Sequence, residues 1–432
     1  MSQRNLLLLI LAIAASYVCY TQGRQNPYGR YLAAGLATID DNSLDLPPDK
    51  ELFAGAMDGM VEVLHGRGDQ HSQFFDEAEA ARLRNEIHQQ IGGIGVRIGM
   101  ADDPPRPVIA GPIDPDTPAG RAKLAPGDRI LEIDGKSTAG MSRNDVLALL
   151  SGNRGTAVRL SINSNDGSQT RTVELVRELI PTESVVGDRR DADGHWLFTL
   201  EDDPRIALIR ITSFGDRTAL EFAAVLQKLT SEGVQAVVLD MRDNAGGALG
   251  SAVAVSERLL PAGKTIVETR GRGQTLRQRY ATTTDGPFRD LPIAVILNQR
   301  SASAAEIVAA CLQDHGRAIV VGERSFGKGT VQQMLPLGKS LLKLTWASFW
   351  RPNGVNIHRS NGATKEAEWG VIPNSGFEKI LSEDEYAAYR EFRDRRDESD
   401  TTPAATPDSI PTKAYVDEQL QLAVPHLQRR LG

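Results

Sequence analysis

The chain has little cysteine and no dense cluster of basic residues. Its two cysteines, Cys19 and Cys311, lie in an N-terminal apolar segment and in a helical pattern, so they provide neither a metal-binding set nor a disulfide framework. The net charge is -7 and the pI is near 5.6, without the basic face that nucleic-acid binding normally needs. We therefore expect protein or peptide partners, no nucleic acid, no metal and no cofactor.

Long apolar runs are also absent, except at the N-terminus. There Arg4 precedes sixteen uncharged residues, Asn5 to Tyr20. This pattern predicts an export signal over residues 1–22. Whether it is cleaved or kept as a membrane anchor stays open. The residues AIA at 12–14 could end a cleaved signal peptide, and the run is slightly short for a spanning helix of about 17 to 25 residues. In both cases we expect the body of the protein in the cell envelope, on the periplasmic side.

The rest of the chain has an ordinary globular composition and divides into four regions. Residues 31–84 have helical apolar spacing. Residues 88–178 contain short alternating runs between turns, which predict a compact, mostly β module. In residues 181–382, apolar strand patterns alternate with amphipathic helices, so we expect an α/β core with a largely parallel sheet covered by helices. Residues 383–432 read as a charged segment, a linker and a helix from about residue 414.

The β module carries two motifs. Residues 117–137 read TPAGRAKLAPGDRILEIDGKS, and residues 92–96 read GGIGV. Glycines alone would fit a bulge or a turn, but together the two motifs closely resemble the PDZ domain. This resemblance implies that backbone N–H groups of a short loop bind the C-terminal carboxylate of a peptide, which then adds as a strand along the following edge. The loop residues are Gly93, Ile94, Gly95 and Val96.

The α/β region carries three polar segments that follow strand patterns. They read LDMRDNAGG at 239–247, NQRSASAAEIVAACLQDHG at 298–316, and GERSFGKGTVQQ at 322–333. The carboxyl ends of parallel strands are where ligands and chemistry often sit. A serine at a helix start also lies near the positive end of the helix dipole and near free amides.

The residues by themselves leave several readings open. Ser303 and Glu306 match a capping box, so the serine could serve the helix alone. A phosphate-binding loop is excluded because Gly329 stands where that motif needs Ser or Thr. His315 lies about 18 Å from Ser303 along the predicted helix, too far to act as its base. A buried lysine can lose its proton near neutral pH, so Lys328 remains a candidate base.

In their order along the chain, the PDZ-like module, DNAGG, SASAAE and FGKGTVQQ resemble the carboxyl-terminal processing peptidases, also called tail-specific proteases. The resemblance covers nearly everything from about residue 32 to the last helix. It implies a crotonase-like sheet-and-helix peptidase core with an inserted PDZ domain. In that family the nucleophile stands 25 residues before the lysine, which selects Ser303 over Ser301. Lys328 would be the general base, and Gln332 would orient it.

The same resemblance implies an oxyanion hole formed by the backbone N–H groups of Ala304 and Gly246. Ala245 stands where the family usually has a proline that stiffens the glycine turn. Ser301 would shape the turn before the helix. Asp314, which is sometimes counted as catalytic in the family, would lie about 16 Å from Ser303, and we interpret it as structural.

Two functions from different classes follow. The first is an exported serine endopeptidase that recognises C-terminal tails through its PDZ domain and cleaves through an acyl-enzyme. The alternative is a non-catalytic envelope scaffold that binds protein C-termini. The presence of a nucleophile, a base and oxyanion donors together favours the enzyme. The sequence leaves open whether the chain forms a homo-oligomer or uses an adaptor.

Overall fold

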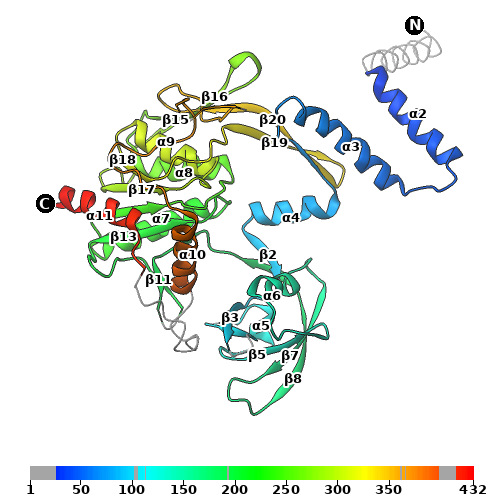
Figure 1. Cartoon of the computed structure of the whole chain (residues 1–432), viewed down its shortest axis with the longest axis horizontal. Coiled ribbons are helices and arrows are strands. Elements are labelled where there is room, and N and C mark those ends of the chain that lie inside the picture. The colour runs from blue at the N-terminus through cyan, green and yellow to red at the C-terminus, as the bar shows by residue number, and fades with distance from the viewer. Residues whose placement is uncertain are drawn as a thin grey trace, which may run out of the picture.

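The computed structural model describes residues 26–101, 106–111, 113–191, 194–360, 362–364, 366–397 and 415–432. Figure 1 shows its main parts, an elongated helical N-terminus, a small β domain and a larger α/β core. The predicted export signal at 1–22 and the predicted linker TTPAATPDSIPT at 401–412 lie outside the described residues. Within these ranges no helix has the length and apolar character needed to span a membrane.

The N-terminal region is mostly helical but contains one strand. Its elements are α2 Pro27–Asn42, α3 Asp49–His65, β1 Gln73–Phe75 and α4 Glu77–Ile87. Strand β1 pairs antiparallel with β20, Ser340–Trp350, and buries Phe74. The prediction of a helical region over 31–84 is therefore wrong at β1, because three residues are too few to show a strand period. Helices α2 and α3 extend away from the body of the molecule (Figure 1).

The β domain has its main strands in the order β3-β4-β5-β7-β8. The elements are β3 Arg97–Ala101, β4 Arg106–Ala110, α5 Pro118–Arg121, β5 Arg129–Ile133, β6 Lys136–Ser137, α6 Arg143–Leu150, β7 Ala157–Asn163 and β8 Thr170–Val176. Alternate apolar residues of these strands form a core of their own with α6. A two-stranded stem joins this domain to the rest, made of β2 Gln90–Gly93 and β9 Glu178–Pro181.

The α/β core is built on a sheet in the order β10-β13-β14-β17-β18. The last four strands are parallel, as predicted. The strands are β10 Val185–Val186, β13 Ile206–Ile211, β14 Ala236–Asp240, β17 Ile293–Leu297 and β18 Ala318–Gly322. Helices α7 Thr218–Ser231, α8 Leu249–Leu259 and α9 Ala304–Asp314 cover one face, and α11 Glu418–Leu431 covers the other. This arrangement places the carboxyl ends of β14 and β17 side by side.

A second, antiparallel sheet packs on the far side of α8 and α9 (Figure 1). Its strands are β15 Thr265–Arg270, β16 Leu276–Ala281, β19 Thr330–Leu337 and β20, with β1 at one edge. The 3-10 turn η1 Arg272–Gln274 and the short strands β11 Arg189–Arg190 and β12 Trp196–Leu197 complete the core. The sequence did not predict this sheet, whose β19–β20 hairpin brings Gln332, Met334 and Lys343 to the cavity described below.

The charged segment after residue 383 is a helix, α10 Glu383–Asp397. Its apolar spacing is weak because charged side chains make part of its buried contacts, as Arg393 does with Asp188 at 3.2 Å. The C-terminal helix α11 begins at Glu418, a few residues after the expected start near 414. Its Ala423 and Leu427 are fully buried under the parallel sheet.

Candidate active site

Two turns meet where the neighbouring strands β14 and β17 end. The first follows Asp240 and contains Asn244 and the glycine pair. The second follows Leu297 and leads into α9. The two turns are joined by backbone and side-chain hydrogen bonds: Ala302 N donates to Asn244 O at 2.9 Å, and Asp243 N donates to Asn298 Oδ1 at 3.0 Å. The parallel topology thus brings two of the predicted motifs to one edge.

Ser303 stands at the N-terminus of α9 with φ 53° and ψ -112°. A non-glycine residue in this region of positive φ is strained by about 1–3 kcal/mol. Ser301 holds the preceding turn, since its Oγ donates to Met241 O at 2.8 Å and accepts Asn298 N–H at 3.0 Å. Ser301 is thus occupied in shaping the turn, and Ser303 lines an open cavity.

Glu306 connects the serine turn to the lysine segment. Its buried carboxylate accepts four hydrogen bonds. Oε2 accepts the backbone N–H of Ser303 at 2.7 Å and that of Lys328 at 2.9 Å. Oε1 accepts Ser325 Oγ–H at 2.5 Å and Gly327 N–H at 2.7 Å. Burial raises the pKa of Glu306 to about 7, although the four donors favour the charged form. The sequence predicted only the hydrogen bond from Ser303 N–H to Glu306, which caps the helix, and not the bonds to the lysine segment.

Lys328 lies in the segment after β18, between two glycines. A Cβ on Gly329 would stand 2.1 Å from His358 N, so this close backbone approach requires glycine. Burial lowers the pKa of Lys328, and the charge of Glu306 opposes that effect. Ser303 and Lys328 line the same cavity of about 540 Å³. A lysine whose neutral form is favoured by burial, in one cavity with a serine, has the chemistry of a base and a nucleophile.

Gln332 lines the same cavity but is held by threonines. Its Nε2 donates to Thr330 Oγ1 at 2.8 Å and to Thr345 Oγ1 at 3.2 Å, and Thr345 in turn donates to Asp69 Oδ1 at 2.8 Å. Across the described ranges, neither Gln332 nor Ser303 Oγ is hydrogen-bonded to the Lys328 amine. Catalytic hydrogen bonds often form only when substrate is bound.

Gly246 packs against the serine. It has φ 100°, and a Cβ there would lie 2.8 Å from Ser303 Cβ and 3.0 Å from Ala304 N. Its N–H, however, donates to Asn244 Oδ1 at 2.8 Å. The expectation of a free Gly246 donor is therefore not met in this conformation, because the Asn side chain bonds the backbone two residues on. Ala304 begins α9, where N–H groups have no partner within the helix.

One loop links the glycine pair to the root of the β domain. Phe214 N donates to Gly246 O at 2.9 Å, and Ala248 N donates to Phe214 O at 2.6 Å. On the other side of the loop, the side-chain Oε1 of the buried Gln89 accepts Arg217 N–H at 2.5 Å. The stem of the β domain is therefore one loop away from the glycine turn, a connection that the sequence did not reveal.

The predicted carboxylate-binding loop divides between strand and turn. Gly93 lies in β2 opposite Glu178. Ile94 to Val96 form the turn before β3, in which Gly95 has φ 82° and no room for a Cβ beside Thr117. Strand β3 is at the edge of the sheet, and α6 packs beside it. The domain thus presents a strand edge that a peptide could extend.

Two other residues singled out in the sequence have structural partners. Asp314 pairs with Arg351 at 2.5 Å, and its side chain is 6% exposed. The ring of His315 contacts Thr265 O at 2.7 Å through Nε2. Both lie at the opposite end of α9 from Ser303. Within the described residues, no group of three or more His, Cys, Asp or Glu side chains is placed to hold a metal ion.

Comparisons with known proteins identify the class and the family. Residues 205–374 match the model of peptidase family S41, and residues 110–163 match that of a PDZ domain. The chain is 30% identical over 411 residues to the carboxy-terminal-processing protease of Bartonella bacilliformis, covering 93% of this chain and 90% of the relative. It is 31% identical to the carboxy-terminal processing protease CtpB of Bacillus subtilis (72% and 61%) and 30% identical to the tail-specific protease of Haemophilus influenzae (81% and 48%).

Among solved structures, a photosystem II D1 C-terminal processing protease aligns at 25% identity and a TM-score of 0.45, covering 81% of this chain and 92% of that one. The fold, the serine and lysine in one cavity, and the family matches define a serine-type peptidase with a PDZ domain. More specifically, the chain belongs to the carboxy-terminal-processing proteases of peptidase family S41. The predicted family, enzyme class and α/β fold class are confirmed.

Proposed function

We propose that this protein is an exported serine endopeptidase that cleaves protein substrates with a Ser303/Lys328 dyad. The observation that carries the proposal is the shared cavity of Ser303 and Lys328, whose backbone N–H groups bind the same Glu306 oxygen. That common acceptor fixes the nucleophile turn and the base segment relative to each other. Positioning of this kind makes a large contribution to enzymatic rates.

In the proposed reaction, the neutral Lys328 amine takes the proton of Ser303 Oγ as the oxygen attacks the scissile carbonyl carbon. The ammonium then protonates the departing amine, and the acyl group remains as an ester on Ser303. Water, deprotonated by the same lysine, attacks the ester carbon; the Oγ–C bond breaks, the ammonium returns the proton to Ser303 Oγ, and the acid is released. Gln332 lies in the cavity wall and would orient the lysine amine.

The oxyanion of both tetrahedral intermediates would be bound by the N–H groups of Ala304 and Gly246. For Gly246 this requires its N–H to turn from Asn244 Oδ1 toward the substrate. Substrate binding would supply the competing acceptor. Each oxyanion donor contributes about 100- to 1,000-fold to kcat in enzymes of this kind.

The PDZ domain would capture the free C-terminus of the substrate. Gly93 to Val96 would bind its carboxylate, and the tail would add along β3 beside α6. The substrates in this proposal are proteins with exposed, flexible C-terminal tails. An amidated tail, which lacks the carboxylate, should be cleaved more slowly at limiting concentration.

Export to the cell envelope is the part of the proposal that rests on residues 1–22 alone. Their composition supports a segment that directs the chain across the membrane and is then cleaved or retained as an anchor. Cell fractionation of the full chain, with an intact-mass measurement of its N-terminus, tests this. Recovery of the uncleaved chain in the cytoplasm would contradict export.

The catalytic proposal is tested with purified protein lacking residues 1–25 and an unfolded protein substrate. Ser303→Ala and Lys328→Ala should each reduce cleavage by at least about 1,000-fold. Lys339→Ala, at an exposed lysine paired with Glu77, should leave the rate unchanged. A Ser303→Ala variant that cleaves at the wild-type rate would contradict the assignment. Binding of tail peptides without labelling of Ser303 by a serine-reactive phosphonate would favour the non-catalytic scaffold.

A further inference from the structure

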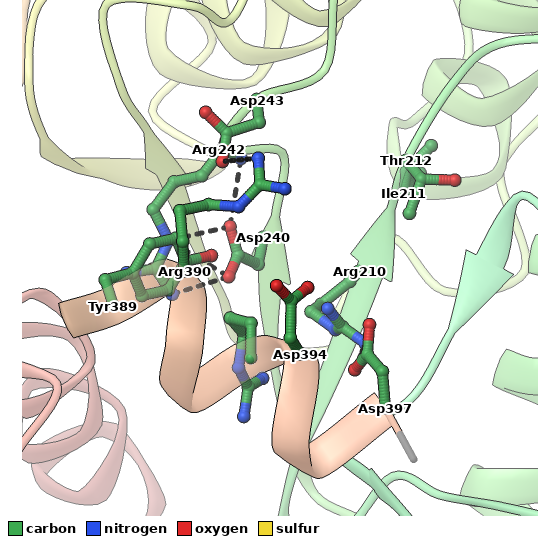
Figure 2. A pocket seen from close by; sticks show the side chains of 11 residues that line it. Arg210, Ile211, Thr212, Asp240, Arg242, Asp243, Tyr389, Arg390, Asp394 and Asp397 are labelled. Carbon is green, nitrogen blue, oxygen red and sulfur yellow. Dashed lines mark hydrogen bonds and ion pairs between the residues drawn. The ribbon is translucent and has the colours of Figure 1, made fainter. Parts of the chain in front are cut away.

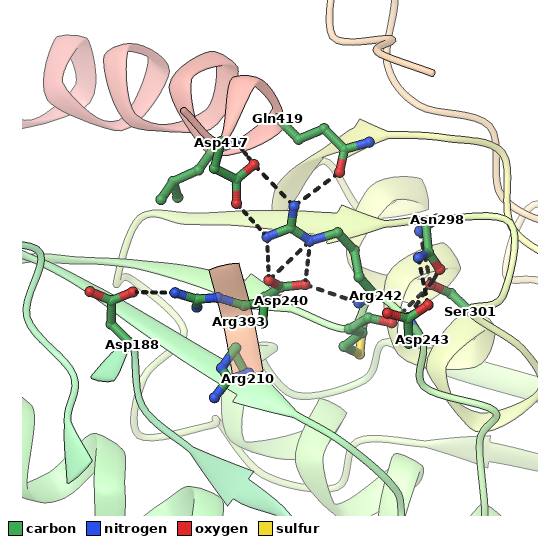
Figure 3. Close-up of polar contacts among 12 residues, drawn as sticks. Asp188, Arg210, Asp240, Arg242, Asp243, Asn298, Ser301, Arg393, Asp417 and Gln419 are labelled. Atoms are coloured by element: carbon green, nitrogen blue, oxygen red, sulfur yellow. Dashed lines mark hydrogen bonds and ion pairs between the residues drawn. The ribbon is translucent and has the colours of Figure 1, made fainter. Parts of the chain in front are cut away.

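Arg242 is a fully buried residue whose charge is shared between the core and the C-terminal helix. Its Nε and Nη2 donate to Asp240 at 3.0 and 2.6 Å. Its Nη1 and Nη2 donate to Asp417 at 3.0 and 2.8 Å, and Nη1 also donates to Gln419 Oε1 at 3.0 Å. Figure 3 shows the guanidinium enclosed by these three side chains. Each of its five N–H groups can therefore have an acceptor.

The partners of Arg242 come from segments that are far apart in the sequence. Asp240 ends β14, whereas Asp417 and Gln419 lie at the start of α11. Asp417 Oδ1 also accepts Leu420 N–H at 3.1 Å and so caps that helix. The Tyr389 ring of α10 lies 4.2 Å from the guanidinium carbon. Arg242 thus contacts both C-terminal helices at the end of a central strand.

The residues that follow Arg242 lead directly into the glycine turn of the proposed active site. Asp243 has φ 59° and is held by α10 through Tyr386 Oη–H at 2.8 Å. Figure 2 shows Arg242 and Asp243 together with Tyr389 and Asp394 of α10, and these four residues are among those that line a cavity of about 170 Å³. The glycine turn therefore begins on a residue that α11 holds and continues on one that α10 holds.

Loss of the α11 contact would leave buried N–H groups of Arg242 without acceptors. Asp240 keeps the charge neutralised, but the two bonds to Asp417 and the one to Gln419 are lost. A buried charged donor without its partner is costly enough for the side chain to move toward another acceptor or toward water. Because Arg242 N also donates to Asp240 Oδ1 at 3.0 Å, such a movement acts on the backbone that enters the turn.

We propose that the start of α11 is a latch for the glycine turn, with Asp417 as a positioning residue that acts through Arg242. Docking of α11 would hold the turn beside Ser303, so that only the Gly246 N–H has to reorient from Asn244 when substrate binds. Release of α11 would then switch catalysis off while the substrate cavity and the PDZ domain remain intact. The catalytic side of this inference rests on the Ser303/Lys328 proposal.

The test compares Asp417→Asn with two controls in the protein that lacks residues 1–25. Asparagine retains the helix cap but removes the charge that faces Arg242. Glu418→Gln changes a neighbouring exposed carboxylate that binds Lys379. Leu427→Ala lowers the stability of the fold near the end of α11 and leaves every acceptor of Arg242 at the start of the helix in place. We expect Asp417→Asn to lower kcat about 10- to 100-fold with KM changed less than about twofold, because misplacement by about 1 Å has effects of this size.

Both controls should keep the wild-type kcat below their unfolding temperatures, although Leu427→Ala unfolds at a lower temperature. Hydrogen exchange of residues 241–249 should be faster in Asp417→Asn than in either control. Gln419→Met removes one acceptor of Arg242. It should lower kcat and speed up hydrogen exchange at 241–249, each by less than Asp417→Asn does. It serves as the test variant if Asp417→Asn does not fold.

Wild-type kcat and wild-type exchange in Asp417→Asn would overturn the latch. So would a kcat loss that tracks the unfolding temperature equally in Asp417→Asn and Leu427→Ala. The exchange measurement does not depend on catalysis. If Ser303→Ala remains active while exchange at 241–249 is faster in Asp417→Asn, the dyad fails and the positioning of the turn by α11 stands.

Discussion

Replacing Glu306 with glutamine should make the protein more stable at neutral pH and less active. The substitution removes a buried charge that accepts four hydrogen bonds. The NH2 group of the new side chain cannot accept a hydrogen bond. It fits best in place of Oε1, where the Ser325 hydroxyl can turn and accept from it. Gly327 N–H then loses its acceptor. A protonated Glu306 meets the same constraint, so the glutamine variant imitates the neutral form of the wild type.

The magnitude follows from the pKa of Glu306, which burial raises from 4.5 to about 7. A group whose pKa is higher in the folded state contributes stability below about pH 4.5, and this contribution is lost as the pH rises through 7. At about 1.4 kcal/mol per pH unit, the interval corresponds to about 3 kcal/mol. We therefore expect the two proteins to be equally stable near pH 4.5. Above pH 7 the glutamine variant should be more stable by about 3 kcal/mol.

Denaturant unfolding at several values from about pH 4.5 to 8 measures this difference, in a Ser303→Ala background that prevents self-digestion. Glu378→Gln, at an exposed carboxylate, controls for the loss of one negative charge. Parallel stability curves with and without the Glu306→Gln substitution would refute the reasoning. In the active background, kcat should fall about 10- to 100-fold, because Gly327 loses its anchor beside Lys328.

Three further predictions concern the site and its surroundings. Gly246→Ala should fold but lose cleavage, because its Cβ would lie 2.8 Å from Ser303 Cβ; a folded variant with wild-type kcat would contradict this. Asp314→Asn should lower unfolding stability by about 3–5 kcal/mol in calorimetry, by breaking the buried pair with Arg351, and leave kcat unchanged. Wild-type kcat should rise with pH through the pKa of Lys328, which burial lowers, since only the neutral amine accepts a proton; a falling rate would count against the base.

The local parts of this site could be predicted because each is encoded in consecutive residues. A strand pattern, a polar turn and a helix pattern place Ser303 at a helix start, and adjacent glycines mark the close approach around Lys328. The parallel strands were predictable for the same reason, since they are continuous apolar runs between amphipathic helices. The residue spacing and the family resemblance then paired the serine with the lysine.

Contacts between distant segments left no pattern in the sequence. The second sheet depends on pairings such as β1 with β20, whose partners are separated by most of the chain. Helix α10 was missed because part of its buried face is charged. Its Arg393 is buried in an ion pair with Asp188, a residue 205 positions earlier in the chain. The engagement of Gly246 N–H by Asn244 likewise depends on a side-chain orientation that the motif does not specify.

The order of the domains, the helix start at Ser303 and the glycine-flanked Lys328 can be read from the chain alone, because they follow from local periodicity and turn chemistry. The binding of both segments by Glu306 and the link from the glycine turn through Arg242 to Asp417 become visible in the folded chain. Buried charged groups take their hydrogen-bond partners from whichever segments the fold brings together. That choice is made by packing of the whole chain and is not visible in any short stretch of it.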